Sequence, residues 1–266
     1  MKKLSALFLF FVASFGFAQS GKLAQPKSSN VDWLVSPFEQ KATITKEGQH
    51  IVLNNGLVKR SFVIAPNVAC FDYTNLTNGQ QLIRSIEPEA KVVIDQITYK
   101  VGGLSGQKEK AYLQIDQIKN LQKADSDFVF SKYTIGKIEP FIKWKPTTWI
   151  GNAKQPTGAR IEFEYISPIA ALKNIIIKVH YEIYDGIPLI TKWISIQNNS
   201  NNSIKINRVV NEVLGLVEEE SAVVGKPEEM KKQHGIYVET NYAFNNAMRY
   251  DISDQTTHWK VDLAYT

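Results

Sequence analysis

The stretch His180-Tyr-Glu-Ile-Tyr-Asp-Gly-Ile-Pro-Leu-Ile-Thr-Lys-Trp193 decides the fold of this chain. Asp185-Gly186 stands between two long runs rich in apolar residues, and an Asp-Gly pair favours a tight reversal between antiparallel strands. Apolar and polar residues alternate with a period of two before the turn (residues 175–184) and in part after it (residues 189–197). That period is typical of β-strands. The stretch therefore predicts a long β-hairpin.

The two runs of this hairpin each have two distinct faces. In the second run the residues of one face are Ile190, Lys192, Ile194 and Ile196, and those of the other are Leu189, Thr191, Trp193, Ser195 and Gln197. This mixture predicts a sheet that is packed on both sides near its centre and wetter towards its ends. Because Trp193 lies in the middle of its strand, we expect it in the core.

The rest of the chain repeats this pattern on a shorter scale, with β-like runs separated by turn residues such as Asn54-Asn55-Gly56 and Asn78-Gly79. Helix is scarce, and residues 111–124 are the best candidate. The predicted strands are Thr43–Lys46, His50–Leu53, Leu57–Ala65, Val68–Asn75, Gln81–Ser85, Lys91–Asp95, Thr98–Val101, Phe128–Thr134, Ile138–Trp144, Arg160–Ile166, Ile175–Tyr184, Leu189–Gln197, Ser203–Leu216 and Ile236–Glu239. Many strands and little helix predict an all-β fold of two stacked antiparallel sheets, forming one domain over residues 32–266.

The first 18 residues have the three parts of a secretory signal peptide. Two lysines are followed by an apolar run, and Gly16-Phe-Ala18 places small residues at the −3 and −1 positions, which predicts cleavage before Gln19. The apolar run is shorter than the ~20 residues that span a bilayer. We therefore expect an exported protein, periplasmic or extracellular, with no membrane span after cleavage. Residues 19–31 form a polar leader that we expect to be flexible.

The charge of the chain argues against nucleic-acid binding, and its cysteine content argues against a disulfide framework. The formal charge of +5 falls to +3 without Lys2 and Lys3, and no basic cluster interleaved with aromatic residues is present, so a nucleic-acid partner is not expected. Cys70 is the only cysteine, which excludes an intrachain disulfide. Its apolar neighbours predict a buried and unreactive thiol.

The sequence predicts no catalytic residue, no metal site and no cofactor. Glycoside hydrolysis needs two carboxylates that face each other across the sugar. The acidic pairs of this chain, Asp125/Asp127, Glu218/Glu219 and Asp251/Asp254, stand next to each other in charged loops, where solvation is the usual role. Asp185 is expected to cap local backbone in its turn. His180 and Glu182 lie on one face of a strand, but no third metal ligand accompanies them.

Aromatic and polar loop residues are the remaining candidates for ligand contact. Trp144 and Trp149 flank Pro146 in a predicted loop, where a ligand or a partner domain could reach them. Nearer the C-terminus, Tyr242, His258 and Trp259 combine a phenol, an imidazole and an indole, a set that suits hydrogen bonding and stacking against sugars. These last three are the predicted carbohydrate-binding residues.

A succession of short phrases resembles the N-terminal region of exported bacterial α-galactosidase-like (melibiase-like) glycoside hydrolases. The resemblance is collinear from about Asp32 to the C-terminus. The phrases that carry it are Asn54-Asn-Gly-Leu-Val-Lys-Arg60, Ala65-Pro-Asn67, Asn75-Leu-Thr-Asn-Gly79, Pro88-Glu-Ala90, Val101-Gly-Gly-Leu104, Asp185-Gly-Ile-Pro-Leu189 and Thr257-His-Trp259.

This resemblance implies a β-supersandwich of the galactose-mutarotase-like kind, followed in the family by a (β/α)₈ barrel that carries the nucleophile and the acid/base. It implies that this chain is an accessory portion, truncated before the barrel and incomplete at its C-terminal end, with a galactose-containing glycan and the barrel as partners. Tyr242, His258 and Trp259 would rim the sugar pocket. The alternatives are a stand-alone carbohydrate-binding or mutarotase-like protein, and a structural or adhesive envelope module.

Overall fold

The computed structural model describes residues 32–108, 111–140, 155–217 and 236. Within these residues the protein is an all-β, sandwich-like structure, and every pair of named strands is antiparallel. The only helices in the described part are two short 3₁₀ segments, η1 (Ile115–Asn120) and η3 (Ala170–Leu172). The prediction of an all-β antiparallel sandwich is confirmed.

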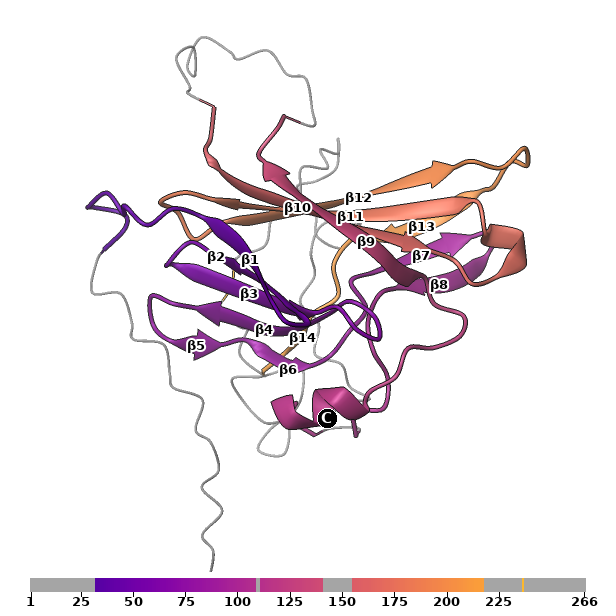
Figure 1. The fold of residues 1–266 in the computed structure, drawn as a ribbon, viewed down its shortest axis with the longest axis horizontal. Coiled ribbons are helices and arrows are strands. Elements are labelled where there is room, and N and C mark those ends of the chain that lie inside the picture. Colours follow the sequence, from indigo (N-terminus) through magenta and orange to yellow (C-terminus); the bar gives the residue numbers. More distant parts are fainter. Residues whose placement is uncertain (1–31, 109–110, 141–154, 218–235, 237–266) are drawn as a thin grey trace, which may run out of the picture.

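One layer of the sandwich is a four-stranded sheet in the order β12-β11-β10-β9, which crosses the upper part of Figure 1. Its strands are β9 (Val129–Lys137), β10 (Gly158–Ile166), β11 (Ile175–Tyr184) and β12 (Ile190–Asn198). The predicted hairpin is its β11–β12 pair, in which Tyr181 lies opposite Lys192 and His180 opposite Trp193. The predicted hairpin is therefore present, with Ile183 opposite Ile190 as the pair nearest the turn.

The facing layer is built from three smaller sheets. Figure 1 shows the five-stranded sheet β1-β2-β3-β4-β5 under one end of the long sheet and the three-stranded sheet β13-β7-β8 under the other. A two-stranded sheet, β14-β6, completes the layer. The bounds of these strands are β1 (Thr43–Glu47), β2 (His50–Asn54), β3 (Val58–Val63), β4 (Ala69–Asn75), β5 (Gln80–Gln81), β6 (Ile83–Ser85), β7 (Ala90–Ile94), β8 (Ile97–Val101), β13 (Ile206–Val210) and β14 (Gly215–Leu216).

A single large core lies between these layers. Phe62 of β3, Val92 of β7 and Tyr181 of β11 belong to the same buried cluster, so the separate sheets of the lower layer share one interior. A smaller cluster packs η1 against β3 and β4 through Ile118 and Phe71. Burial of apolar area on this scale is the main stabilising term for a chain that has no intrachain disulfide.

The two turns that the sequence singles out meet in space. The side chain of Asn55 is fully buried, and its Nδ2 donates to the carbonyl oxygens of Tyr184 and Ile187, each at 2.7 Å, across the β11–β12 turn. Its Oδ1 accepts from the backbone N–H groups of Leu57 and Val58. One asparagine thus satisfies its own turn and ties it to the hairpin of the opposite layer.

Asp185 also acts at long range, which corrects the expectation that it caps local backbone. Its carboxylate accepts from the N–H of Ala42 at 2.7 Å and from Oγ1 of Thr157 at 2.7 Å. Burial opposes the charge, but these two hydrogen bonds and Lys41 hold the pKa of the Asp185 carboxyl below its ordinary value. The chain entering β1 and the chain entering β10 are therefore both fastened to the hairpin turn.

A bulge in β4 directs side chains into two different clusters. The β3–β4 register shifts between Ser61 and Phe62, so that Cys70 instead of Phe71 lies opposite Phe62. Cys70 therefore faces the main core, while Phe71 packs in the smaller cluster beside η1. The thiol is buried, as predicted, and burial raises its pKa to about 12.

Several boundaries predicted from the sequence were wrong. The single run Ser203–Leu216 is divided between β13 and β14, because residues 211–214 leave the sheet and direct Glu212 into the interior. The run Gln81–Ser85 is split between β5 and β6, which pair with different strands. Residues 111–124 form only the short η1 segment.

Other predicted strands cannot be compared in full. Of Ile138–Trp144, residues 138–140 are not in a strand and residues 141–144 lie outside the described residues, as does Ile236–Glu239 beyond residue 236.

Candidate functional site

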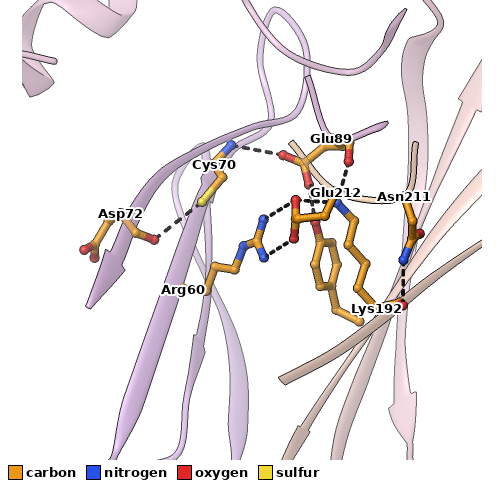
Figure 2. Close-up of polar contacts among 8 residues, drawn as sticks. Arg60, Cys70, Asp72, Glu89, Lys192, Asn211 and Glu212 are labelled. Atoms are coloured by element: carbon orange, nitrogen blue, oxygen red, sulfur yellow. Dashed lines mark hydrogen bonds and ion pairs between the residues drawn. The ribbon is translucent and has the colours of Figure 1, made fainter. Parts of the chain in front are cut away.

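Charged side chains gather in the interior where the two layers meet, and Figure 2 shows this group. The interior charged cluster consists of Arg60, Glu89, Tyr181, Lys192 and Glu212. Strand β3 supplies Arg60, the paired strands β11 and β12 supply Tyr181 and Lys192, and the other two residues lie next to β7 and β13. Segments from both layers, spread between residues 60 and 212, therefore converge on one point.

Both acidic residues of the cluster are held by basic ones. The guanidinium of Arg60 binds the Glu212 carboxylate through two contacts, Nη1–Oε2 at 2.7 Å and Nη2–Oε1 at 3.2 Å. Lys192 Nζ lies 2.8 Å from Glu212 Oε1 and 3.8 Å from Glu89 Oε2, and it also donates to the Glu89 carbonyl. The remaining partners of the Glu89 carboxylate are the Tyr181 hydroxyl and the N–H of Cys70. Two carboxylates thus face two cations, a balanced set.

Aromatic rings surround the cations of this cluster. The Arg60 guanidinium carbon lies 5.3 Å from the ring centroid of Phe62, 5.0 Å from that of Tyr73 and 4.8 Å from that of Tyr181. Lys192 Nζ lies 5.1 Å from the Tyr181 centroid. Such contacts favour a desolvated cation through the negative ring face. The rings therefore help to keep the charges stable where water cannot reach them.

The pKa values in the cluster favour its charged form. Burial by itself lowers the pKa of Arg60, but the Glu212 carboxylate outweighs it and the pKa is raised. Burial by itself raises the pKa of Glu212, but Arg60 and Lys192 outweigh it and the pKa is lowered. Burial also raises the pKa of Tyr181 well above its ordinary value, so this phenol stays protonated as a donor to Glu89.

This arrangement suits a structural junction better than an acid/base pair. An acid catalyst needs a carboxyl that holds a proton near neutral pH, and its partner must be free to reach the substrate. Here Glu212 is bound by two cations, and the Glu89 side chain is 1% exposed. The cluster connects the sheets of both layers.

A second polar group lies on the opposite side of the four-stranded sheet. We define the outer face as the side of β9–β12 turned away from the core, and its residues alternate in register with the buried ones. Its members include Lys132, Arg160, Glu162, Glu164, Lys178, His180, Glu182, Tyr184, Thr191, Trp193 and Ser195. Carboxylates, hydroxyls, an imidazole and an indole are thus brought onto one surface of the sheet.

Most acidic groups on the outer face are paired with lysines. Lys178 Nζ lies 2.7 Å from Glu162 Oε1 and 3.8 Å from Glu164 Oε2, and Lys132 reaches the same Glu164 oxygen at 3.5 Å. The hydrogen bond to Glu162 is the largest of the effects that raise the pKa of Lys178. These pairs lie in β9, β10 and β11, so they are cross-strand pairs that stabilise the sheet.

His180 is fixed by its neighbours on adjacent strands. Its ring stacks on Trp193 with centroids 4.9 Å apart and planes inclined by 3°. Nε2 lies 3.0 Å from Ser195 Oγ, and Nδ1 lies 3.4 Å from Glu162 Oε2. Burial lowers the pKa of His180, with Glu162 acting in the opposite sense, which favours the neutral imidazole. The ring is therefore an uncharged part of the surface.

Glu182 differs from the other acids of this face. Glu182 is only 2% exposed, and its Oε2 accepts a hydrogen bond from the Tyr184 hydroxyl at 2.7 Å. Its other oxygen, Oε1, is buried and has no hydrogen-bond partner. No cation within 4.0 Å pairs with Glu182 in the described part of the chain. A buried carboxylate oxygen without a donor is unusual in a folded protein.

The carbohydrate-binding residues predicted from the sequence, Tyr242, His258 and Trp259, lie outside the described residues, as do Trp144 and Trp149. The expectation that Trp193 belongs to the core was wrong. It is half-buried on the outer face, because its register partner His180 points to that face. His180 and Glu182 share a face, as predicted.

The interior charged cluster was missed, although the sequence contained a sign of it. Lys192 shares its face with Ile190, Ile194 and Ile196, which pack against the core, and a lysine among such residues needs an acidic partner inside the protein. The identity of that partner could not be read, because Glu89 and Glu212 are 103 and 20 residues away from Lys192. Only the tertiary structure brings them together.

The described residues contain no group of three or more His, Cys, Asp or Glu side chains that could hold a metal ion. Among the same residues, no helix has the length and apolar character required to cross a membrane. No family model, curated protein or solved structure matches the chain.

Proposed function

We propose that this chain is the non-catalytic β-sandwich portion of an exported α-galactosidase-like glycoside hydrolase. In this role it supports a (β/α)₈ catalytic domain and contributes to carbohydrate binding. The resemblance of its collinear phrases to that family supplies the proposal, and the all-β antiparallel sandwich is the architecture that such a portion requires.

The observation that carries the non-catalytic role is the neutralisation of the interior acids. Glu89 and Glu212 are the acidic residues brought together between the layers, and Arg60 and Lys192 bind them. A retaining glycosidase needs a carboxylate free to attack the sugar, ~5 Å from a second carboxyl that holds a proton. A cluster committed to internal ion pairs fits a supporting domain instead.

Activity and binding assays on the purified protein test this proposal. We expect no hydrolysis of an aryl α-galactoside, with a known α-galactosidase as the positive control, and measurable heat on titration with galactose or raffinose. Hydrolysis by the purified chain would contradict the non-catalytic role. Absence of heat with every sugar would contradict the contribution to carbohydrate binding.

Export is tested separately. We expect the mature protein recovered from the periplasm or medium to begin at Gln19, which N-terminal sequencing or intact mass measurement would determine. A full-length protein retained in the cytoplasm would contradict export.

A further inference from the structure

We propose that the outer face around Glu182 is a carbohydrate-binding site, in which Oε1 of Glu182 accepts a hydrogen bond from a sugar hydroxyl. The class of ligand rests on the proposed function, whereas the position of the site rests on the geometry of this face.

The first argument is that one carboxylate oxygen of Glu182 has no hydrogen-bond donor. Glu182 Oε1 is shielded from solvent and has no hydrogen-bond partner, whereas Oε2 of the same carboxylate accepts from Tyr184. Burying a carboxylate oxygen without a donor is unfavourable, and such positions are retained where a ligand supplies the donor. The group is therefore held ready for an incoming O–H or N–H.

The second argument is the contrast with chemically identical neighbours. Glu162 and Glu164 lie on the same face, and each is bound by Lys178. Glu182 lies between Arg160 of β10 and Thr191 of β12 in the strand register, yet Arg160 pairs with Glu139 instead. The absence of a cationic partner is therefore particular to Glu182 among these three acids.

The third argument is the chemistry of the surroundings, which fits a polyhydroxyl ligand. The Tyr184 and Thr191 hydroxyls lie 3.2 Å apart beside Glu182. The Tyr184 proton is donated to Glu182, so its oxygen is left to accept, and the oxygen of Thr191 can also accept from a ligand. Because the Glu182 carboxylate has no cation paired with it among the described residues, a phosphate or another anion is disfavoured next to its free oxygen.

Arg160 of β10, the register neighbour of Glu182, is held by a weak ion pair. The Arg160 side chain is 26% exposed and pairs with Glu139, whose side chain is 70% exposed, at 3.3 Å. Exposed ion pairs of this kind contribute little to stability. The Arg160 side chain beside Glu182 can therefore change position at a small cost in free energy.

Isothermal titration with galactose, raffinose and a panel of galactose-containing oligosaccharides tests the proposal. Glu182→Gln removes one carboxylate oxygen, and we expect at least a tenfold weaker affinity for the sugar that the unaltered protein binds. Glu164→Gln is the matched control, because it makes the same change on the same face at an acid already paired with lysines. We expect it to bind as the unaltered protein does.

Thermal unfolding of the same proteins separates a ligand site from a structural role. Because Glu182→Gln removes a buried carboxylate that has no cation, we expect its melting temperature to be unchanged or raised while binding is lost. Equal affinity of Glu182→Gln and the unaltered protein would overturn the site. So would failure of the unaltered protein to bind any sugar of the panel, and the proposed accessory role would then rest on the hydrolysis assay alone.

Discussion

The inner and outer faces of the β9–β12 sheet both carry charged side chains, but the two faces differ in whether every carboxylate oxygen has a partner. On the inner face Lys192 and Tyr181 complete a cluster in which every carboxylate oxygen has a partner. On the outer face the Glu182 carboxylate keeps one oxygen without any. The carboxylates of the inner cluster are thus all paired, and its buried atom without a partner is a donor, Nε of Arg60, whereas on the outer face a carboxylate acceptor is unpaired.

The largest effect is expected from breaking the inner cluster. Arg60→Ala leaves Glu212 with only Lys192 and removes a guanidinium packed against three aromatic rings. We expect it to lower the free energy of unfolding by about 3–5 kcal/mol, as for loss of one partner of a buried ion pair. Urea denaturation followed by circular dichroism measures this change.

The control for that variant is Lys59→Ala. Lys59 is on the same strand but points to the other side, where it pairs with Asp72 at 2.7 Å and is 29% exposed. We expect a loss of about 1 kcal/mol or less for this partly exposed pair. Equal losses for the two variants would show that the inner cluster has no special structural role.

A smaller effect is expected from the hydrogen bonds that join the two turns. Asn55→Ala deprives the carbonyls of Tyr184 and Ile187 of their donor and the N–H groups of Leu57 and Val58 of their acceptor. We expect a loss of about 3 kcal/mol in the free energy of unfolding, since each buried group left unpaired costs about 1–3 kcal/mol and some will reach water.

Asn54→Ala is the matched control for this turn. The Oδ1 atom of Asn54 accepts from the N–H of Gly56. Among the described residues, the Asn54 side chain makes no hydrogen bond to the opposite layer. We expect a clearly smaller loss than for Asn55→Ala in the same urea titration. A loss as large as that of Asn55→Ala would mean that the local turn, and not the link between layers, is what stabilises the protein.

The contribution of the inner cluster to stability is expected to depend on pH through Glu212. Arg60 and Lys192 lower the pKa of Glu212 in the folded state. As the pH falls through 4.5, the ordinary pKa of a glutamate, the unfolded state therefore takes up a proton on Glu212 before the folded state does. The stabilisation is complete above about pH 4.5 and is lost as the pH falls through the folded pKa. Urea midpoints measured from pH 7 to pH 3 test this.

Glu212→Gln serves as the reference in that series. We expect its midpoint to be lower at pH 7 and to fall less steeply below pH 4.5 than that of the unaltered protein, because the group that titrates is gone. Parallel curves for the two proteins would contradict a charged Glu212 in the folded state. Asp185, whose pKa is also lowered, is present in both proteins and cancels in the comparison.

The smallest effect is expected on the outer face. Glu164→Gln removes a charge that lies 3.5 Å from Lys132 and 3.8 Å from Lys178, both of which reach solvent. We expect a change of about 1 kcal/mol or less in the free energy of unfolding. A loss comparable to that of Arg60→Ala would show that the ion pairs of this face stabilise the fold as strongly as the inner cluster.

Much of the architecture could be predicted from local pattern. The β11 strand matches its predicted range, and most other strands differ by one to three residues at their ends, because period-two alternation and Gly-containing turns act over short distances. The division of Ser203–Leu216 could not be predicted, since it depends on Glu212 meeting Arg60 and Lys192 inside the fold. The candidate site was predicted only in part. The sequence placed His180 and Glu182 on one face, but it gave no sign that Oε1 of Glu182 would be buried without a hydrogen-bond donor.

The sequence by itself determined the all-β class, the β11–β12 hairpin and the two turns, because these follow from side-chain alternation and backbone preferences within a few residues. The tertiary structure alone decided which charges are neutralised and which carboxylate is left without a donor. Those outcomes depend on contacts between residues up to 152 positions apart, as for Arg60 and Glu212, and the strength of each charge depends on its burial.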